Sequence, residues 1–193
     1  PPDLCAWEFL DYIAVLKGVA GTASRRRQVD EVLELTRLAD VADRRIKTYS
    51  GGMKRRLGIA QALLGDPRLL IVDEPTAGLD PEERVRFRNL LAEVAQRCAV
   101  VLSTHIVEDI SQSCGQMVVL WQGSVIFDGE PGELVDRVRG RVWTLVNGDD
   151  TRPNADLVVI SSRQTSGGTQ YRVLGEPGPE SQPAPAEPTL EDG

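Results

Sequence analysis

The sequence predicts an α/β fold, and three observations support this prediction. Two short apolar runs, LLIVD (69–73) and AVVLS (99–103), have the composition of parallel strands that are buried on both faces. A helical pattern lies between the two runs, and more helical patterns precede the first one. Strands and helices that alternate in this order indicate a doubly wound α/β layer, whose functional groups follow the C-terminal ends of its strands.

Three helices are predicted before the first strand. Residues 6–17 carry apolar side chains at helical spacing, and Gly18 ends this pattern. A second helical pattern covers about 25–38, and a third covers about 52–64.

The helix between the two strands has a clear start signal. Asp80 is a good N-cap, Pro81 suits the first helical position, and Glu82 and Glu83 favour the positive end of the helix dipole. The second strand ends in Thr104-His105 and leads to another short helix.

The C-terminal part of the chain has a different texture. The runs MVVLW and SVIFD flank Gln122-Gly123, which predicts a tight hairpin, and residues 131–139 predict a last helix. Three weakly alternating strands are expected at the end of the chain, at 141–147, 157–162 and 169–174. Residues 176–188 contain five prolines and predict an extended, disordered linker.

Composition restricts the class of protein. The chain has 193 residues, of which 41% are apolar, so it is long enough to bury a core. Its net charge of −7 argues against a nucleic-acid partner, which would be bound through basic patches. The three cysteines are isolated in the sequence, and this spacing fits a reducing cytosol better than a disulfide framework or a zinc site.

The third helical pattern begins with three consecutive cations at 54–56, directly after Ser50, Gly51 and Gly52. Cations are unfavourable at the positive N-terminus of a helix, so we expect a negative group in front of it. Free backbone N–H groups, a hydroxyl and little side-chain bulk suit a phosphate. The alternative is an ordinary N-cap followed by a solvated basic face.

Three side chains at the predicted strand ends are candidates for chemistry. Asp73 and Glu74 follow the first apolar run, where a carboxylate can hold Mg²⁺ and another can orient or deprotonate a water molecule. His105, the single histidine, follows the second run and can hydrogen-bond a γ-phosphate while a nearby acid holds it. The alternatives are two acids that end a strand in solvent, and a structural histidine.

These motifs together carry a specific resemblance. The run SGGMKRRLGIAQALLGDPRLLIVDEPTAGLDP, followed by VVLSTH, resembles the nucleotide-binding domain of an ABC ATPase over roughly residues 5–140. Tyr49–Met53 resembles the ABC signature, with Tyr and Met where the commonest form has Leu and Gln. Asp73 and Glu74 resemble the Walker B aspartate and the catalytic glutamate, Ala77–Asp80 resembles the D-loop, and His105 resembles the switch histidine.

The resemblance implies a set of site residues. Glu74 and His105 would be catalytic, and Asp73 would hold the metal. The implied ATP-binding residues are Tyr49, Ser50, Gly51, Gly52, Met53, Lys54 and Asp80. In this family the signature helix points at the γ-phosphate of ATP held by the opposite subunit, which would supply the expected anion.

The resemblance also predicts a domain plan, part of a P-loop NTPase core. Residues 1–65 would form the helical subdomain with the signature, and 66–140 the C-terminal part of the ATPase core. Residues 141–175 would form a small β-rich accessory region, and 176–193 a proline-rich disordered tail. The residues contain no GxxxxGK[ST] loop, and they open without Met, so we expect an N-terminally truncated copy that lacks Walker A and the Q-loop.

The expected function is that of an ATP-binding and ATP-hydrolysing subunit that uses ATP and Mg²⁺ to drive export. The motif wording resembles ABC-2-type exporters, which implies transmembrane permease subunits and a head-to-tail second ATPase subunit as partners. The expected location is cytoplasmic, peripheral on the inner face of the membrane, with no nucleic-acid partner. The alternatives are a catalytically incompetent fragment, and a soluble ABC ATPase that acts on ribosomes or DNA.

Overall fold

The computed structural model describes residues 3–147, 153–154, 156–178 and 183–193. The chain divides into two units, Pro1–His105 and Ile106–Gly193. This boundary lies inside the range that the sequence assigns to the ATPase core, and the predicted domain ranges stay a prediction. Among the described residues, no helix combines the length and the apolar character that crossing a membrane requires.

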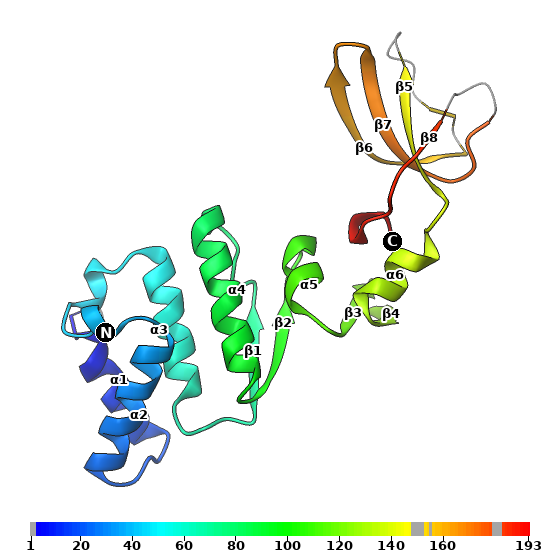
Figure 1. Ribbon diagram of the computed structural model, residues 1–193. Coiled ribbons are helices and arrows are strands. Elements are labelled where there is room, and N and C mark those ends of the chain that lie inside the picture. Colours follow the sequence, from blue (N-terminus) through cyan, green and yellow to red (C-terminus); the bar gives the residue numbers. More distant parts are fainter. Residues whose placement is uncertain (1–2, 148–152, 155, 179–182) are drawn as a thin grey trace. The chain divides into compact units, whose positions relative to one another are not determined.

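Three helices open the first unit, as predicted, and pack against one another (Figure 1). They are α1 (Ala6–Leu16), α2 (Thr22–Leu35) and α3 (Gly51–Leu63), with the short 3₁₀ helices η1 (Ala39–Val41) and η2 (Ile46–Thr48) between the last two. Leu10, Val29 and Leu57 are among the buried side chains that join them. The helices form the predicted helical part of the molecule.

The second helix is displaced from its predicted range of about 25–38. It begins after Gly21, whose φ of 80° is easily adopted by glycine, and it ends at Leu35. Arg37 takes a left-handed φ of 55°, its N–H donates to the Glu34 carbonyl, and the Leu38 N–H donates to the Leu33 carbonyl. This pair of bonds is a Schellman motif, which closes the helix without the usual glycine.

The remainder of the first unit is a strand, a helix and a second strand. They are β1 (Leu69–Asp73), α4 (Pro81–Ala95) and β2 (Ala99–Ser103). The two strands are parallel, and Asp73 is paired in register with Ser103. Asp80 caps α4 by accepting from the Glu83 N–H at 2.8 Å, as the sequence predicts. The α/β fold class is therefore confirmed.

The prediction that both strands are buried on both faces is wrong for this chain. Leu70 is buried, but the side chains of Leu69, Ile71 and Val101 are 51%, 69% and 51% exposed. Helix α4 packs against β2 and supplies buried Phe87 to the same core. Because helices in the described part of the first unit cover one face of this sheet, alternate residues of β1 remain in solvent.

The second unit begins with a short helix and a hairpin. Its first elements are α5 (Val107–Ser113), β3 (Met117–Trp121), β4 (Ser124–Gly129) and α6 (Pro131–Arg137). Gln122 and Gly123 turn the hairpin with φ values of 48° and 78°, which is the left-handed pair that a two-residue type I′ turn requires. The predicted hairpin is confirmed.

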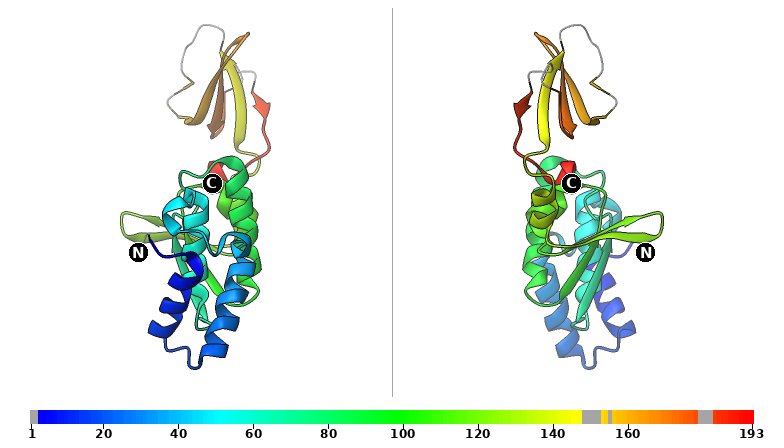
Figure 2. Two further views of the ribbon diagram at one scale, coloured as in Figure 1. Left: turned by 90° about the vertical axis from the view of Figure 1, so that its left-hand side faces the viewer. Right: turned by 90° about the vertical axis from the view of Figure 1, so that its right-hand side faces the viewer.

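A four-stranded sheet follows, and Figure 2 shows it from two sides. Its strands are β5 (Val142–Asn147), β6 (Val158–Thr165), β7 (Gly168–Leu174) and β8 (Ala184–Pro185), in the order β6-β7-β5-β8. Leu145, Leu157, Tyr171 and Val173 form its own small core. The three strands predicted in this region are therefore present.

Parts of the segment predicted to be a disordered linker and tail form secondary structure, and the prediction for the segment as a whole stays a prediction. Ala184 and Pro185 pair with β5, and Leu190–Asp192 forms the 3₁₀ helix η4. Arg172 of β7 explains this order, because its guanidinium donates to the Asp192 carboxylate at 2.5 and 2.7 Å. Residues 179–182 of the predicted linker lie outside the described residues.

Candidate functional site

The ends of the two parallel strands bring the predicted catalytic pair together. The Nδ1 atom of His105 lies 2.8 Å from Oε1 of Glu74, although the two residues are 31 positions apart. The backbone continues the strand pairing here, because the Glu74 N–H donates to the Ser103 carbonyl at 2.9 Å. Parallel strands present their carboxyl ends at one edge, so the contact follows from the register.

Glu74 has an unusual backbone and a partly enclosed side chain. Its φ of 45° lies in the left-handed region, which costs a non-glycine residue about 1–2 kcal/mol. Its Oε2 atom is buried, and within the described residues it has no hydrogen-bond partner. Strain and an unsatisfied acceptor are both unfavourable for folding, and they are typical of residues kept for function.

Asp73 is exposed and is bound on one side only. Its Oδ1 accepts a hydrogen bond from the hydroxyl of Ser103, the paired residue on β2. Sequence reasoning missed Ser103, although its position at the end of the second apolar run could have identified it. The serine orients the Asp73 carboxylate and leaves its second oxygen available to a ligand.

The two carboxylates fit Mg²⁺ in chemistry and in number. Among the described residues, no group of three His, Cys, Asp or Glu side chains is arranged to hold a metal. Mg²⁺ in phosphate sites usually keeps several waters and takes one or two carboxylates together with phosphate oxygens. Exposed Asp73 and the unpartnered oxygen of Glu74 suit that arrangement.

The turn before α3 carries the candidate ATP-binding residues. Ser50 is the N-cap, since its Oγ accepts from the Met53 N–H at 3.2 Å, and both Ser50 and Gly51 are exposed. A Cβ atom on Gly52 would meet the Glu83 carboxylate, so a larger residue there would require that side chain to shift. The helix start therefore has the ordinary N-cap that one interpretation predicts. It also has the exposed turn without bulky side chains that a phosphate site requires.

Three more residues of the predicted set differ in exposure. Tyr49 is buried, and its hydroxyl donates to the Val41 carbonyl at 2.7 Å. Burial raises the pKa of the Tyr49 phenol, which keeps this donor protonated. Met53 packs partly against the core, whereas Lys54 is exposed. The side chain of Tyr49 thus holds the turn in place from inside.

The cations at the start of α3 have partners in the chain itself. Arg55 donates to the Ala77 carbonyl, and Arg56 donates to the carbonyls of Thr36 and Arg37 at 3.4 and 3.2 Å. Those two carbonyls lie at the C-terminus of α2, which is the negative end of its dipole. The three cations therefore need an external anion less than the sequence suggests. The cation that an external anion would mainly contact is Lys54, which is exposed.

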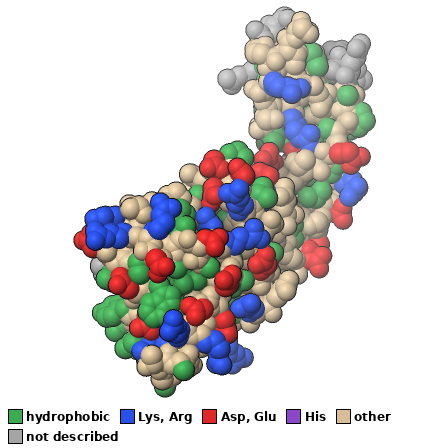
Figure 3. Space-filling view, turned by 60° about the vertical axis from the view of Figure 1, so that its left-hand side comes forward, with side chains coloured by type: hydrophobic (Ala, Val, Ile, Leu, Met, Phe, Trp, Pro, Cys, Tyr) green, Lys and Arg blue, Asp and Glu red, His purple; other side chains and the backbone are tan. Residues whose placement is uncertain are grey.

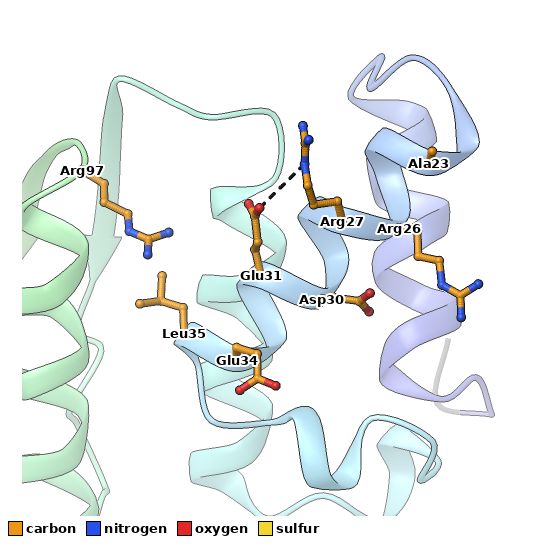
Figure 4. Close-up of a pocket in the computed structure, with 8 residues that line it drawn as sticks. All are labelled: Ala23, Arg26, Arg27, Asp30, Glu31, Glu34, Leu35 and Arg97. Atoms are coloured by element: carbon orange, nitrogen blue, oxygen red, sulfur yellow. Dashed lines mark ion pairs between the residues drawn. The ribbon is translucent and has the colours of Figure 1, made fainter.

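A hollow on the first unit lies away from the predicted site residues. It has a volume of about 900 Å³ and is lined by residues of α2 and by Arg97, as Figure 4 shows. Its lining residues are Ala23, Arg26, Arg27, Asp30, Glu31, Glu34, Leu35 and Arg97. Three acids offset three arginines, so the hollow has no charge preference for a polyphosphate, and it includes none of the predicted site residues.

Charges of both signs are mixed on one face of the molecule. On the face drawn in Figure 3, acidic and basic side chains lie interspersed, with hydrophobic side chains between them. A broad basic patch of the kind that binds nucleic acid is not formed by the side chains visible on that face.

Comparisons with known proteins agree with the motifs. The family described as ABC transporter matches residues 4–77. An uncharacterized ABC transporter ATP-binding protein, YxlF of Bacillus subtilis, is 39% identical over 148 residues, which are 75% of this chain and 50% of that protein. The Nod factor export ATP-binding protein I of Cupriavidus metallidurans is 35% identical over 181 residues, which are 92% of this chain and 59% of that protein.

Solved structures show the same fold. The cbiO1 protein from Clostridium perfringens, part of the ABC transporter complex cbiONQ, is 28% identical, with a TM-score of 0.64 over 68% of this chain and 53% of that one. An ATP-binding cassette of an ABC transporter in its ADP conformation is 20% identical and supports the fold alone, with a TM-score of 0.61 over 71% of this chain and 59% of that one. The chain spans about half the length of the curated relatives that it matches.

Proposed function

Because the chain belongs to the family of ABC transporter ATP-binding domains, we propose that it supplies the strand-end half of an ATP-hydrolysing site. The observation that carries this proposal is the 2.8 Å contact between Glu74 and His105 at the end of two adjacent parallel strands. A carboxylate and an imidazole at one sheet edge are the groups that a water-activating phosphate site needs.

Each strand-end residue has a distinct proposed role. Glu74 is the general base, because a carboxylate with an unpartnered oxygen can accept a hydrogen bond from the attacking water. Asp73 is the metal ligand, held in orientation by the Ser103 hydroxyl. When bound, Mg²⁺ would be held by Asp73 and would offset the negative charge of the phosphate groups. His105 donates to the γ-phosphate and remains tied to Glu74.

The turn before α3 would bind a second nucleotide. An anion at this helix N-terminus would meet the backbone N–H groups of the first turn, together with exposed Ser50, Gly51 and Lys54. We assign this turn to ATP held by a second ATPase subunit, arranged head to tail. Asp80, the N-cap of α4, belongs to the loop at the same subunit boundary.

The physiological role that we propose is export through separate transmembrane permease subunits. The names of several relatives, which are Nod factor export ATP-binding proteins, support this direction of transport, and the ABC-2-type subfamily is our further proposal. The protein would then act on the cytoplasmic side, peripheral to the membrane.

A chimera tests the proposed chemistry. This chain replaces the matching 181-residue segment of the Nod factor export ATP-binding protein I of Cupriavidus metallidurans, and steady-state ATPase activity is measured with MgATP. We expect turnover in the chimera. The variant Glu74→Gln should bind ATP but lose about 10²–10⁴-fold in kcat, because the base that handles the water is absent.

The control is Glu93→Gln, an exposed carboxylate in the last turns of α4, which should leave kcat unchanged. Near-normal turnover of Glu74→Gln would remove that residue from the role of base. A chimera that binds ATP without hydrolysing it would favour a catalytically incompetent chain. ATPase activity that is stimulated by ribosomes or DNA would instead favour a soluble ABC ATPase.

A further inference from the structure

The loop that follows Glu74 is fixed by a side chain from another helix. Residues 74–80 connect the end of β1 to the start of α4, and Ala77–Asp80 form the last part of this connection. Within the loop, the Ala77 and Leu79 N–H groups donate to the Glu74 and Thr76 carbonyls at 3.3 and 3.1 Å. From outside the loop, Arg55 of α3 donates to the Ala77 carbonyl through Nη2. The contact spans 22 residues of sequence.

The surroundings of Arg55 make this contact restrictive. Arg55 is half-buried, and its Nη1 atom is enclosed without a hydrogen-bond partner among the described residues. Burying a charged group is unfavourable when one of its donors lacks a partner. The hydrogen bond to the Ala77 carbonyl therefore has a larger share in compensating for the burial of the guanidinium. Rotating the loop away from α3 would leave that charge without either partner.

Two neighbouring contacts join the same elements. The Glu83 carboxylate of α4 lies close to Gly52, in the space that a Cβ atom would take. Arg56 Nη2 lies 4.0 Å from the same carboxylate, and both side chains are largely shielded, with 16% and 21% exposed. The start of α3 is thus held to the start of α4 beside the Arg55 contact.

We propose that Arg55 is a positioning residue that makes the SGG turn and the loop 77–80 move as one body. The catalytic importance of this contact rests on the proposed function, in which the turn and the loop would both face the second subunit. Its physical basis is independent of nucleotide. Arg55 acts through the Ala77 carbonyl, and Ala77 follows Glu74 after only Pro75 and Thr76.

Hydrogen exchange of the 193-residue chain without nucleotide tests the contact. In Arg55→Ala, the amides of residues 77–79 should exchange about tenfold faster, because the loop loses the hydrogen bond that Arg55 of α3 donates to it, while amides of α1 and α2 keep their rates. In Arg55→Lys, which retains a cationic donor, protection of the loop should be largely restored. Arg27→Ala, at an exposed site on α2, is the matched control and should change nothing in the loop.

Wild-type exchange of residues 77–79 in Arg55→Ala would overturn the proposal. If Arg55→Ala loses protection throughout the first unit, Arg55→Met replaces it, because methionine keeps more of the side-chain volume and has no hydrogen-bond donor. Loss confined to residues 76–80 then supports the proposal, and wild-type exchange or loss throughout the unit overturns it. In the chimera, Arg55→Ala should lower kcat about tenfold with little change in the KM for ATP. An inactive chimera would count against the proposed function, whereas the exchange result would still decide the role of Arg55.

Discussion

At the residue scale, the role proposed for His105 requires one imidazole ring to bind two partners, Glu74 and a phosphate. Its Nδ1 faces Glu74 Oε1 at 2.8 Å, and the carboxylate accepts the hydrogen bond when Nδ1 carries the proton. In a neutral ring Nε2 is then an acceptor, which a phosphate oxygen would repel. Donation to a phosphate through Nε2 therefore requires both ring nitrogens to be protonated, and the Glu74 carboxylate is placed to pair with that cation.

Removing the ring tests this account in the chimera. His105→Ala should lower kcat by about 10²-fold and leave the KM for ATP within a few-fold, because the lost donor acts on developing charge. Asn89→Ala, an exposed site on α4, is the control and should keep wild-type kinetics. Activity of His105→Ala within a few-fold of the parent would assign the histidine a structural role.

The sequence was sufficient to predict which strand-end residues meet. Asp73, Glu74 and His105 each follow an apolar run, and parallel pairing of the runs brings their ends to one edge. The left-handed backbone of Glu74 and the bond from Arg55 to Ala77 were not predictable, because they depend on packing between distant segments. Their proposed catalytic and binding roles stay predictions.

At the scale of single elements, the C-terminal 3₁₀ helix η4 is stabilised mainly by one ion pair. The Asp192 side chain is fully buried, accepts from Arg172 and also accepts from the Thr189 N–H and hydroxyl at 2.6 and 3.0 Å. Burial alone raises the pKa of Asp192. These hydrogen bonds and the Arg172 charge lower the pKa by more than burial raises it, so the net shift is downward. This element is therefore joined to β7 by a charged contact.

Replacing the acid should loosen the four-stranded sheet. Asp192→Asn should lower the free energy of opening at the β7 amides by about 1.5–3 kcal/mol, because Arg172 loses its charged acceptor. Hydrogen exchange of the β5 and β7 amides measures this change. The neighbouring exposed acid gives the control, since Glu191→Gln should leave those amides unchanged. An equal effect of both variants would contradict the assignment.

The same pair predicts an acid dependence. Since the folded-state pKa of Asp192 is lowered, the pair stabilises the sheet fully above the ordinary carboxyl pKa of about 3.9, and this stabilisation is lost as the pH falls through the lowered value. Protection of the β7 amides should therefore fall below about pH 4 in the parent chain. In Asp192→Asn that step should be absent, and a step of the same size in the variant would assign it to other carboxyl groups.

The boundaries of helices and strands were predicted well where the sequence has a capping or turn residue, and poorly where it has none. Asp80-Pro81 marked the start of α4, and Gln122-Gly123 marked the hairpin. Helix α2 ends in a Schellman motif with Arg37 instead of glycine, so no local residue marked its end. The prolines of the C-terminal segment led to the prediction of disorder. The Arg172–Asp192 contact at its far end could not be predicted, because it joins residues that are 20 positions apart.

At the scale of the whole molecule, the sheet of the first unit leaves apolar side chains in solvent. Leu69, Ile71 and Val101 are each at least half exposed and lie on two adjacent strands. Exposed apolar side chains on a short sheet favour association between molecules. The net charge of −7 opposes association, but it acts over the whole surface and not at this face.

Reducing this apolar face should increase the monomeric fraction of the isolated chain. The double variant Ile71→Thr with Val101→Thr keeps β-branched side chains and removes apolar surface, so the strands should persist while association falls. Size-exclusion chromatography with light scattering measures the monomer fraction. Tyr12→Thr, at an exposed site of α1, is the control, and an equal gain from this variant would show that the sheet face is not responsible.

The parallel pairing of β1 with β2 also sets the time at which the site comes into existence. The two strands are separated in the sequence by α4, so they can pair only after the chain has passed through that helix. Closing this loop costs entropy before the contacts between the strands are gained. The Glu74 and His105 side chains therefore meet only in a molecule in which β1 and β2 are paired. A chain that has been made only as far as α4 lacks the proposed catalytic pair.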